Sequence, residues 1–171
     1  MGDSRHTGDG AAAATAVRDR EPWKVHANRP LPALLDHVKE MAVGQLHARL
    51  AEEGFPEIRP GHGCVFRFVE PDGSRLTDLA DRAGLTKQAV GEVVTDLERL
   101  GHVERRSCPD DGRAKIIHLT GSGREAVAAA ERIFADIEAR WAAEVGERRM
   151  ADLRATLNAL VELDRSERPD Q

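Results

Sequence analysis

Apolar side chains recur every three or four positions in several stretches of this chain, which is the spacing of amphipathic helices. One helix is expected to begin near Pro30, because proline is tolerated in a first helical turn, and to end at Gly54. A shorter helix is expected over about residues 60–69, and two long ones over about 120–146 and 148–163, of which the first has Thr120 as its predicted N-cap. The predicted apolar stripe of the helix over 120–146 consists of Val127, Ala130, Phe134, Ile137, Trp141 and Val145.

The middle of the chain shows two further amphipathic stretches separated by a glycine turn. Thr77 is predicted as the N-cap of the first helix, which ends before Gly84. Thr86 is predicted as the N-cap of the second, which extends to about Leu100 and stops at Gly101. A short helix, a tight turn with glycine and a longer helix form the pattern of a helix-turn-helix. The expected core packs Leu76, Leu79, Ala80 and Leu85 against Val90, Val93, Val94 and Leu97.

A β-hairpin is predicted directly after the second of these helices. Residues 103–106 and 114–119 have the pattern of two short strands, and the Pro-Asp-Asp-Gly sequence at 109–112 supplies the turn between them. A hairpin in this position is a wing. The pattern therefore predicts a mostly α fold with a small β-hairpin wing, organised as a winged helix-turn-helix.

Composition and charge narrow the class of protein. The chain has 171 residues, of which 40% are hydrophobic, and it contains neither a long apolar run nor an apolar N-terminal segment. We therefore expect a soluble, cytoplasmic bacterial protein without a membrane span. The formal net charge is −5, although proteins that bind nucleic acids are usually basic. Residues 74–119 hold eight Lys and Arg against eight Asp and Glu, so DNA binding must depend on where the cations lie.

The helix over about 86–100 has the two faces that a recognition helix needs. Its apolar stripe is expected to be buried, while the opposite face presents polar side chains to a major groove wide enough to admit a helix. Lys87 and Gln88 lie at the N-terminal end, which reaches deepest into DNA in this kind of docking. The competing interpretation is that they are ordinary solvated residues of a first turn. The predicted stripe is Val90, Val93, Val94, Leu97 and Leu100, and the predicted DNA contacts are Thr86, Lys87, Gln88, Gly91, Glu92 and Thr95.

The predicted wing is rich in cations, which is the second indication of DNA binding. An arginine at a hairpin tip can enter a narrow minor groove, where the negative potential is enhanced. A solvated surface hairpin with no ligand is the competing interpretation of the same residues. The predicted wing contacts are Arg105, Arg106, Asp111, Arg113 and Lys115.

Residues 75–123 together resemble the MarR family of regulators. The matching elements are a Leu-Ala helix, a turn, a helix that opens with Thr-Lys, a Leu-Glu-x-x-Gly-x-Val-x-Arg sequence, an Asp-Gly-Arg wing and a Leu-Thr closure. With the flanking helices, the resemblance covers about residues 30–163. The residues that carry it are Leu79, Ala80, Thr86, Lys87, Leu97, Glu98, Gly101, Val103, Arg105, Asp111, Gly112, Arg113, Leu119 and Thr120.

The resemblance implies a homodimer that reads a pseudo-palindromic DNA operator, most simply as a repressor. It implies that Arg113 enters the minor groove and that Asp111 holds its guanidinium. Many relatives carry an arginine where this chain has Gly112, which removes one phosphate contact and leaves Arg113 with more of the wing tip.

The resemblance also implies a domain order for the chain. We expect a disordered or weakly ordered tail over residues 1–28, a dimerisation helix over 29–58 and the winged helix-turn-helix over 59–120. Two further dimerisation helices are expected over 121–165, and a short tail over 166–171.

Family members often bind small aromatic or phenolic effectors, so a sensor site is a further hypothesis. Its candidate lining residues are Trp23, His37, His62 and Phe66, each of which has a plain core or surface role as the competing interpretation. Redox sensing through Cys64 or Cys108 is an alternative hypothesis, as is a winged helix used for protein contacts. No cofactor, metal site or catalytic motif is predicted, because neither the spacing of metal ligands nor a nucleophile–base pair occurs in the sequence.

Overall fold

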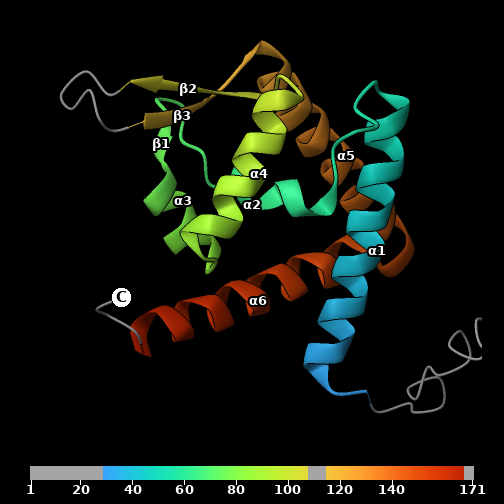
Figure 1. Cartoon of the computed structure of the whole chain (residues 1–171). Helices are drawn as coiled ribbons and strands as arrows, with labels where there is room; N and C mark the ends of the chain where they lie inside the picture. Colours follow the sequence, from blue (N-terminus) through green and yellow to red (C-terminus); the bar gives the residue numbers. More distant parts are fainter. Residues whose placement is uncertain (1–28, 108–114, 168–171) are drawn as a thin grey trace, which may run out of the picture. The chain divides into compact units, whose positions relative to one another are not determined.

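The computed structural model describes residues 29–107 and 115–167 of the chain (Figure 1). The chain divides into two compact units, of which one extends to Lys39 and the other begins at Glu40. None of the helices in the described residues is long and apolar enough to cross a membrane. The elements are α1 (Leu31–Glu52), η1 (Pro60–His62), α2 (Gly63–Phe66), β1 (Ser74–Arg75), α3 (Leu76–Ala83), α4 (Lys87–Arg99), β2 (Val103–Ser107), β3 (Lys115–Leu119), α5 (Gly121–Val145) and α6 (Glu147–Glu167).

The wing is part of a three-stranded antiparallel sheet in the order β1-β3-β2. Arg105 on β2 pairs with Ile117 on β3, which pairs on its other side with Ser74 of β1. The sequence predicts β2 and β3 to within one residue but does not predict β1, because a two-residue strand is too short to show alternation. The predicted fold class, mostly helical with a hairpin wing, is confirmed.

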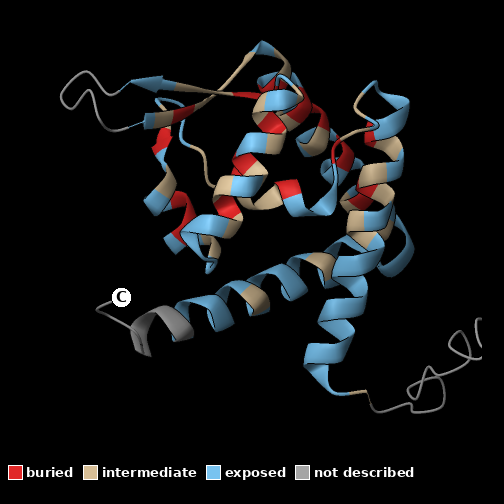
Figure 2. Ribbon diagram, viewed as in Figure 1, coloured by how far each residue is buried: buried red, intermediate tan, exposed pale blue. Residues whose placement is uncertain are grey.

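One hydrophobic cluster holds the helix-turn-helix against the wing. It joins α2, α3, α4 and both wing strands, and Figure 2 shows the buried residues on the inner side of α4. Leu85 was predicted in this core but is 47% exposed, because the turn that starts at Gly84 directs it outward. The buried members are Val65, Leu79, Ala80, Val90, Val94, Leu97, Val103 and Ile117.

A second cluster lies along α5 and overlaps the predicted stripe in part: Ile137 is buried as predicted, and Ala130 and Trp141 pack against the cluster. Phe134 and Val145 were predicted to be buried, but they are 37% and 46% exposed. Alanines form much of the contact surface. Because neighbouring residues of a helix point about 100° apart, a stripe drawn through the large apolar side chains includes Phe134 and Val145 in place of these alanines. The buried members of this cluster are Leu46, Leu50, Ile58, Ala126, Ala129, Ile133 and Ile137.

The helix caps agree with the sequence at two of three predicted positions. The hydroxyl of Thr86 accepts a hydrogen bond from the backbone N–H of Ala89 at 3.2 Å, and Thr120 caps α5 in the same way. The prediction for Thr77 is wrong: α3 begins at Leu76, directly after β1, and has no side-chain cap.

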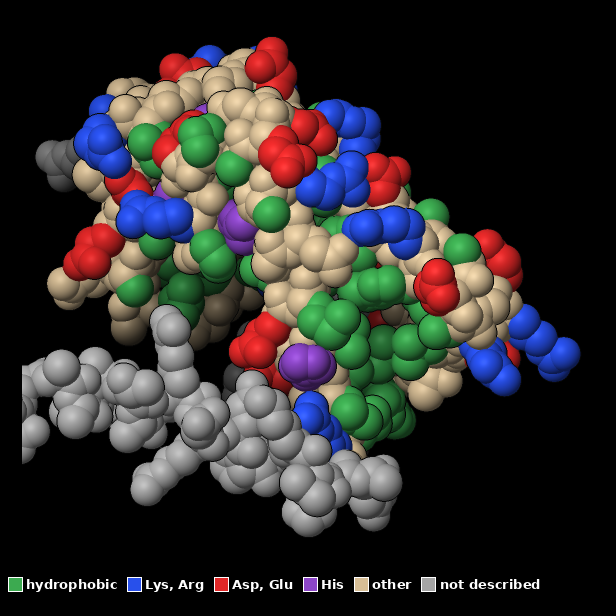
Figure 3. Space-filling view, turned by 90° about the vertical axis from the view of Figure 1, so that its right-hand side faces the viewer, with side chains coloured by type: hydrophobic (Ala, Val, Ile, Leu, Met, Phe, Trp, Pro, Cys, Tyr) green, Lys and Arg blue, Asp and Glu red, His purple; other side chains and the backbone are tan. Residues whose placement is uncertain are grey.

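Two helices differ in length from expectation. The expected helix over 60–69 is a 3₁₀ turn followed by a four-residue α2, and α6 continues to Glu167. In the unit up to Lys39, Leu31, Leu34, Leu35 and Val38 of α1 are all exposed. None of the described side chains of α6 is buried, and Leu153, Leu160 and Val161 are among its exposed apolar residues. Hydrophobic side chains also gather in a patch on the face shown in Figure 3.

Candidate nucleic-acid interface

The outer face of α4 presents a row of polar side chains. The Thr86 cap and the left-handed Gly84 (φ 64°) fix the start of the helix, so that Lys87 and Gln88 are exposed in its first turn. Gly91 follows one turn later and is half-buried. This arrangement matches the two-faced helix that the sequence predicts.

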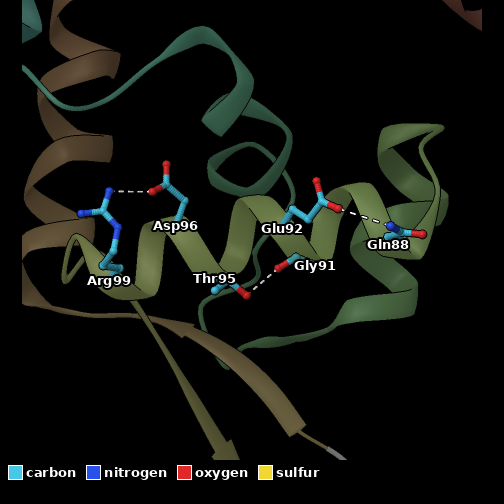
Figure 4. A pocket seen from close by; sticks show the side chains of 6 residues that line it. All are labelled: Gln88, Gly91, Glu92, Thr95, Asp96 and Arg99. Carbon is cyan, nitrogen blue, oxygen red and sulfur yellow. Dashed lines mark hydrogen bonds and ion pairs between the residues drawn. The ribbon is translucent and has the colours of Figure 1, made fainter.

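A shallow hollow lies over this face (Figure 4). Within it, the Gln88 side-chain amide donates to the Glu92 carboxylate at 3.4 Å. The Thr95 hydroxyl donates to the backbone carbonyl of Gly91 at 2.8 Å, so it is engaged with its own helix. The lining residues are Gln88, Gly91, Glu92, Thr95, Asp96 and Arg99.

Asp96, at the far end of the hollow, connects α4 to the segment that precedes α2. Its carboxylate accepts hydrogen bonds from Arg99 Nη2 at 2.7 Å and from His62 Nε2 at 3.1 Å, and it also pairs with Arg59. The hydrogen bond from Arg99, followed by that from His62, lowers the pKa of Asp96 to about 2. Asp96 is thus a compensated anion and does not present an isolated negative charge to a polyanion.

His62 is a buried side chain with a partner at each ring nitrogen. Nδ1 accepts from the backbone N–H of Arg59 at 3.2 Å, and Nε2 faces the Asp96 carboxylate. Burial lowers the pKa of His62, and the nearby Arg59 adds to this effect, although Asp96 opposes it. The result is a neutral histidine that ties residues 59–62 to α4.

The wing cations have different surroundings. Arg105 lies against α4, whereas Arg106 is exposed and bonds Glu104 on its own strand at 2.6 Å. Lys115 is exposed and donates to Ser107 at 2.9 Å. The two predicted residues of the wing tip, Asp111 and Arg113, lie outside the described residues.

The four predicted effector residues are not brought together as a set. Trp23 lies outside the described residues and His37 is exposed. His62 is buried and bonded to Asp96. Phe66 is half-buried and packs against both hydrophobic clusters.

A second buried histidine, His102, is not predicted from the sequence. Its Nε2 lies 2.8 Å from the Glu57 carboxylate and its Nδ1 lies 3.1 Å from the hydroxyl of Ser122. The rings of Phe55 and Phe66 pack on it, with centroids 6.0 and 6.2 Å away. Glu57 and Ser122 are 45 and 20 residues away from His102 along the chain, so no local sequence pattern predicts this site.

The thiol hypothesis finds little support in the described residues. Cys64 is half-buried, its Sγ donates to the carbonyl of Gly61 at 3.1 Å, and burial raises the pKa of the thiol. A raised pKa reduces the thiolate fraction and therefore the reactivity. Cys108 lies outside the described residues. Across residues 29–107 and 115–167, no group of His, Cys, Asp and Glu side chains is arranged to hold a metal ion.

Comparisons with known proteins agree with this geometry. A family model described as "MarR family" matches residues 60–114. The HTH-type transcriptional repressor Rv2887 of Mycobacterium tuberculosis is 28% identical over 131 residues, which cover 77% of this chain and 93% of the repressor.

Two solved structures have a similar fold. The MepR–DNA complex of Staphylococcus aureus has a TM-score of 0.63 at 22% identity and covers 79% of this chain and 98% of MepR. CouR of Rhodococcus jostii RHA1, bound to p-coumaroyl-CoA, has a TM-score of 0.58 at 25% identity and covers 74% of this chain and 88% of CouR.

Proposed function

The chain belongs to the MarR family of winged helix-turn-helix transcriptional regulators, and we propose that it binds double-stranded DNA as a homodimer and represses transcription. This is a family of regulators and not of enzymes. The observation that carries the proposal is the exposed polar face of α4, held at its start by the Thr86 cap and followed directly by the wing. The similarity to a repressor over 77% of the chain supports it.

In this proposal the N-terminal half of α4 enters the major groove. Gln can pair with adenine through two hydrogen bonds, and Lys can donate to guanine or to a phosphate. Lys87 and Gln88 therefore supply base contacts, while Thr86 and the first N–H groups of α4 hold a phosphate. Gly91 lets the helix backbone approach DNA closely. Thr95 and Glu92 border the same groove.

The wing supplies the remaining contacts. Arg113 enters the minor groove and Asp111 orients it, as the family resemblance implies. The exposed Arg106 and Lys115 lie on the two wing strands and neutralise phosphates on either side. Because residues 74–119 have no net charge, the attraction to DNA is local and comes from this arrangement.

Exposed apolar side chains on α1 and α6 support the homodimer. In water, Leu153, Leu160 and Val161 of α6 together expose an apolar stripe that a second copy would cover. Two copies would present two α4 helices to the two halves of a pseudo-palindrome.

Release by a small aromatic effector is the regulatory part of the proposal. CouR, which has the same fold, was crystallised with p-coumaroyl-CoA. Phe66 and His62 remain the candidate contacts among the described residues. Titrating the DNA complex with aromatic acids and their CoA thioesters tests this step, and dissociation by none of them argues against an aromatic effector.

Selection of bound sequences from a random duplex pool tests the proposal as a whole. We expect one enriched pseudo-palindrome, bound with an affinity that falls steeply with salt. Arg113→Ala should weaken binding by about tenfold or more, the range of a specific arginine contact. Arg132→Ala removes the same charge on α5, where Arg132 pairs with Glu53, and should have little effect. Failure to bind any duplex at low salt would reject DNA binding and favour a protein-contact role.

A further inference from the structure

Arg105 belongs to the wing by sequence but to α4 by its contacts. It lies on β2, one of the two edge strands of the sheet, and its guanidinium pairs with Glu98 of α4. Its Nη2 also donates to the Thr95 hydroxyl at 2.9 Å and reaches the Gly91 carbonyl at 3.5 Å. One side chain of the wing thus contacts three residues of α4.

Glu98 holds this arginine at two points. One carboxylate oxygen pairs with the guanidinium, and the other accepts the backbone N–H of Arg105 at 3.3 Å. This backbone N–H belongs to an edge strand, so Glu98 provides it with a partner from the neighbouring helix. The strand and the helix are therefore joined through both backbone and side chain.

Arg106, the next residue, shows what a wing arginine looks like without this role. Its side chain is 61% exposed and its partner, Glu104, is on the same strand. The side chain of Arg105 is only 29% exposed, and its partners within the described part of the chain are all on α4. A phosphate would have to compete with the Glu98 carboxylate for a guanidinium that is already paired on two sides.

We infer that Arg105 is a positioning residue, which fixes the wing against α4 so that the two elements reach neighbouring grooves together, and that it is not itself a phosphate contact. This revises the DNA-contact role that the sequence suggests for Arg105. It rests on the proposed function, since the positioning matters for DNA affinity. The physical gain is entropic, because a wing held in its bound orientation has less freedom to lose when DNA binds.

The two roles predict opposite effects of Glu98→Gln on the affinity for operator DNA. If Arg105 positions the wing, Glu98→Gln should weaken operator binding about tenfold, within the coupling range of contacting residues, although it removes a negative charge. Arg105→Ala should have a similar effect, and the double variant should be little worse than either. If Arg105 contacts phosphate, Glu98→Gln releases it and strengthens binding, which would overturn the inference.

Two matched variants complete the test. Glu104→Gln removes the same charge from β2 and should leave affinity unchanged or slightly higher. Arg105→Lys keeps a cation for phosphate but lacks the planar fork that bonds Glu98 and Thr95 together, so it should resemble Arg105→Ala. Wild-type affinity in Arg105→Lys would contradict the positioning role.

Hydrogen exchange on the free protein gives a readout that does not need DNA. Glu98→Gln and Arg105→Ala should both speed amide exchange over residues 103–107 and 115–119, while global unfolding by urea confirms that each variant is folded. If the wild type binds no duplex, the proposed function fails, and exchange still decides whether the pair holds the wing. Unchanged exchange in both variants would refute the inference.

Discussion

The polar residues of α4 differ in what the protein already does with them. Asp96 is bound by three side chains, and Thr95 is engaged by its own helix and by Arg105. Among the residues that the structure describes, Gln88 and Glu92 make only a long contact of 3.4 Å with each other on the exposed face. These two are therefore the side chains best placed to exchange an internal partner for a base.

Glu92 offers a prediction about base preference. A carboxylate on a DNA-facing helix repels phosphates but can accept a hydrogen bond from the cytosine amino group. Glu92→Gln should relax one cytosine position in the sequences selected from a random pool, by about 1–3 kcal/mol of discrimination. Asp96→Asn serves as the comparison, because Asp96 is occupied by Arg59, His62 and Arg99 and should not alter that position. An unchanged selected sequence with Glu92→Gln would show that Glu92 reads no base.

His62 makes stability depend on pH. Burial lowers its pKa below the ordinary value of 6.5, against the opposing effect of Asp96. Between the unfolded pKa and the lower folded pKa of His62, the unfolded chain binds a proton that the folded chain does not. This histidine therefore has no effect on the free energy of unfolding well above pH 6.5, and it lowers that free energy as the pH falls from 6.5 towards the folded pKa.

Urea unfolding at pH 7.5 and 5.5 measures this effect. The free energy of unfolding should fall between these pH values, and the fall should be smaller in His62→Gln. His37→Gln changes an exposed histidine and should keep the wild-type dependence. An equal fall in His62→Gln would exclude His62 as its source.

At the scale of elements, the junction between the wing and α5 leaves no room for a side chain at Gly123. A Cβ added to Gly123, in the first turn of α5, would lie 2.0 Å from the carbonyl oxygen of His102. The same carbonyl accepts the backbone N–H of Thr120, so it cannot move without cost. This close approach explains why glycine occupies the position.

Gly123→Ala should accordingly destabilise the protein. We expect a loss of about 1–3 kcal/mol, the usual range for overpacking, despite the better helix propensity of alanine. Gly121→Ala, two residues earlier in the same helix, has nothing within 4 Å of its added Cβ and should be neutral or stabilising. Thermal and urea unfolding of both variants provide the measurement. Equal stability of the two variants would argue against the close approach.

The sequence of α5 predicts that it is a helix and where it ends, but not which of its sides is buried. Helix type and ends were predictable because Thr120 and Gly146 act within one turn of the chain. The buried side was not, since α5 carries alanines and large apolar residues on several faces, and only the position of its partner selects one. Phe134 lies outside the buried side of α5 and is partly exposed.

At the scale of the whole molecule, the exposed stripe of α6 predicts an assembly. Leu153 and Leu160 are separated by seven residues, two turns of a helix, and are 47% and 45% exposed. Leu160→Glu should convert a dimer to monomer in sedimentation and weaken operator binding, because the two half-sites are then bound separately. Ala155→Glu adds the same charge on the opposite side of α6 and should leave the dimer intact. A Leu160→Glu variant that remains dimeric would place the interface elsewhere.

The sequence by itself determined the order of the helices and of the two wing strands, the helix-turn-helix spacing and the presence of the wing. It could do so because caps, turn glycines and apolar periods act over a few neighbouring residues. Tertiary structure alone decided which distant groups meet: Arg59 and His62 with Asp96, Glu57 and Ser122 with His102, and Arg105 with Glu98. A charged residue has the same local pattern whether it faces solvent or a partner, so its role depends on the packing of the elements that carry it.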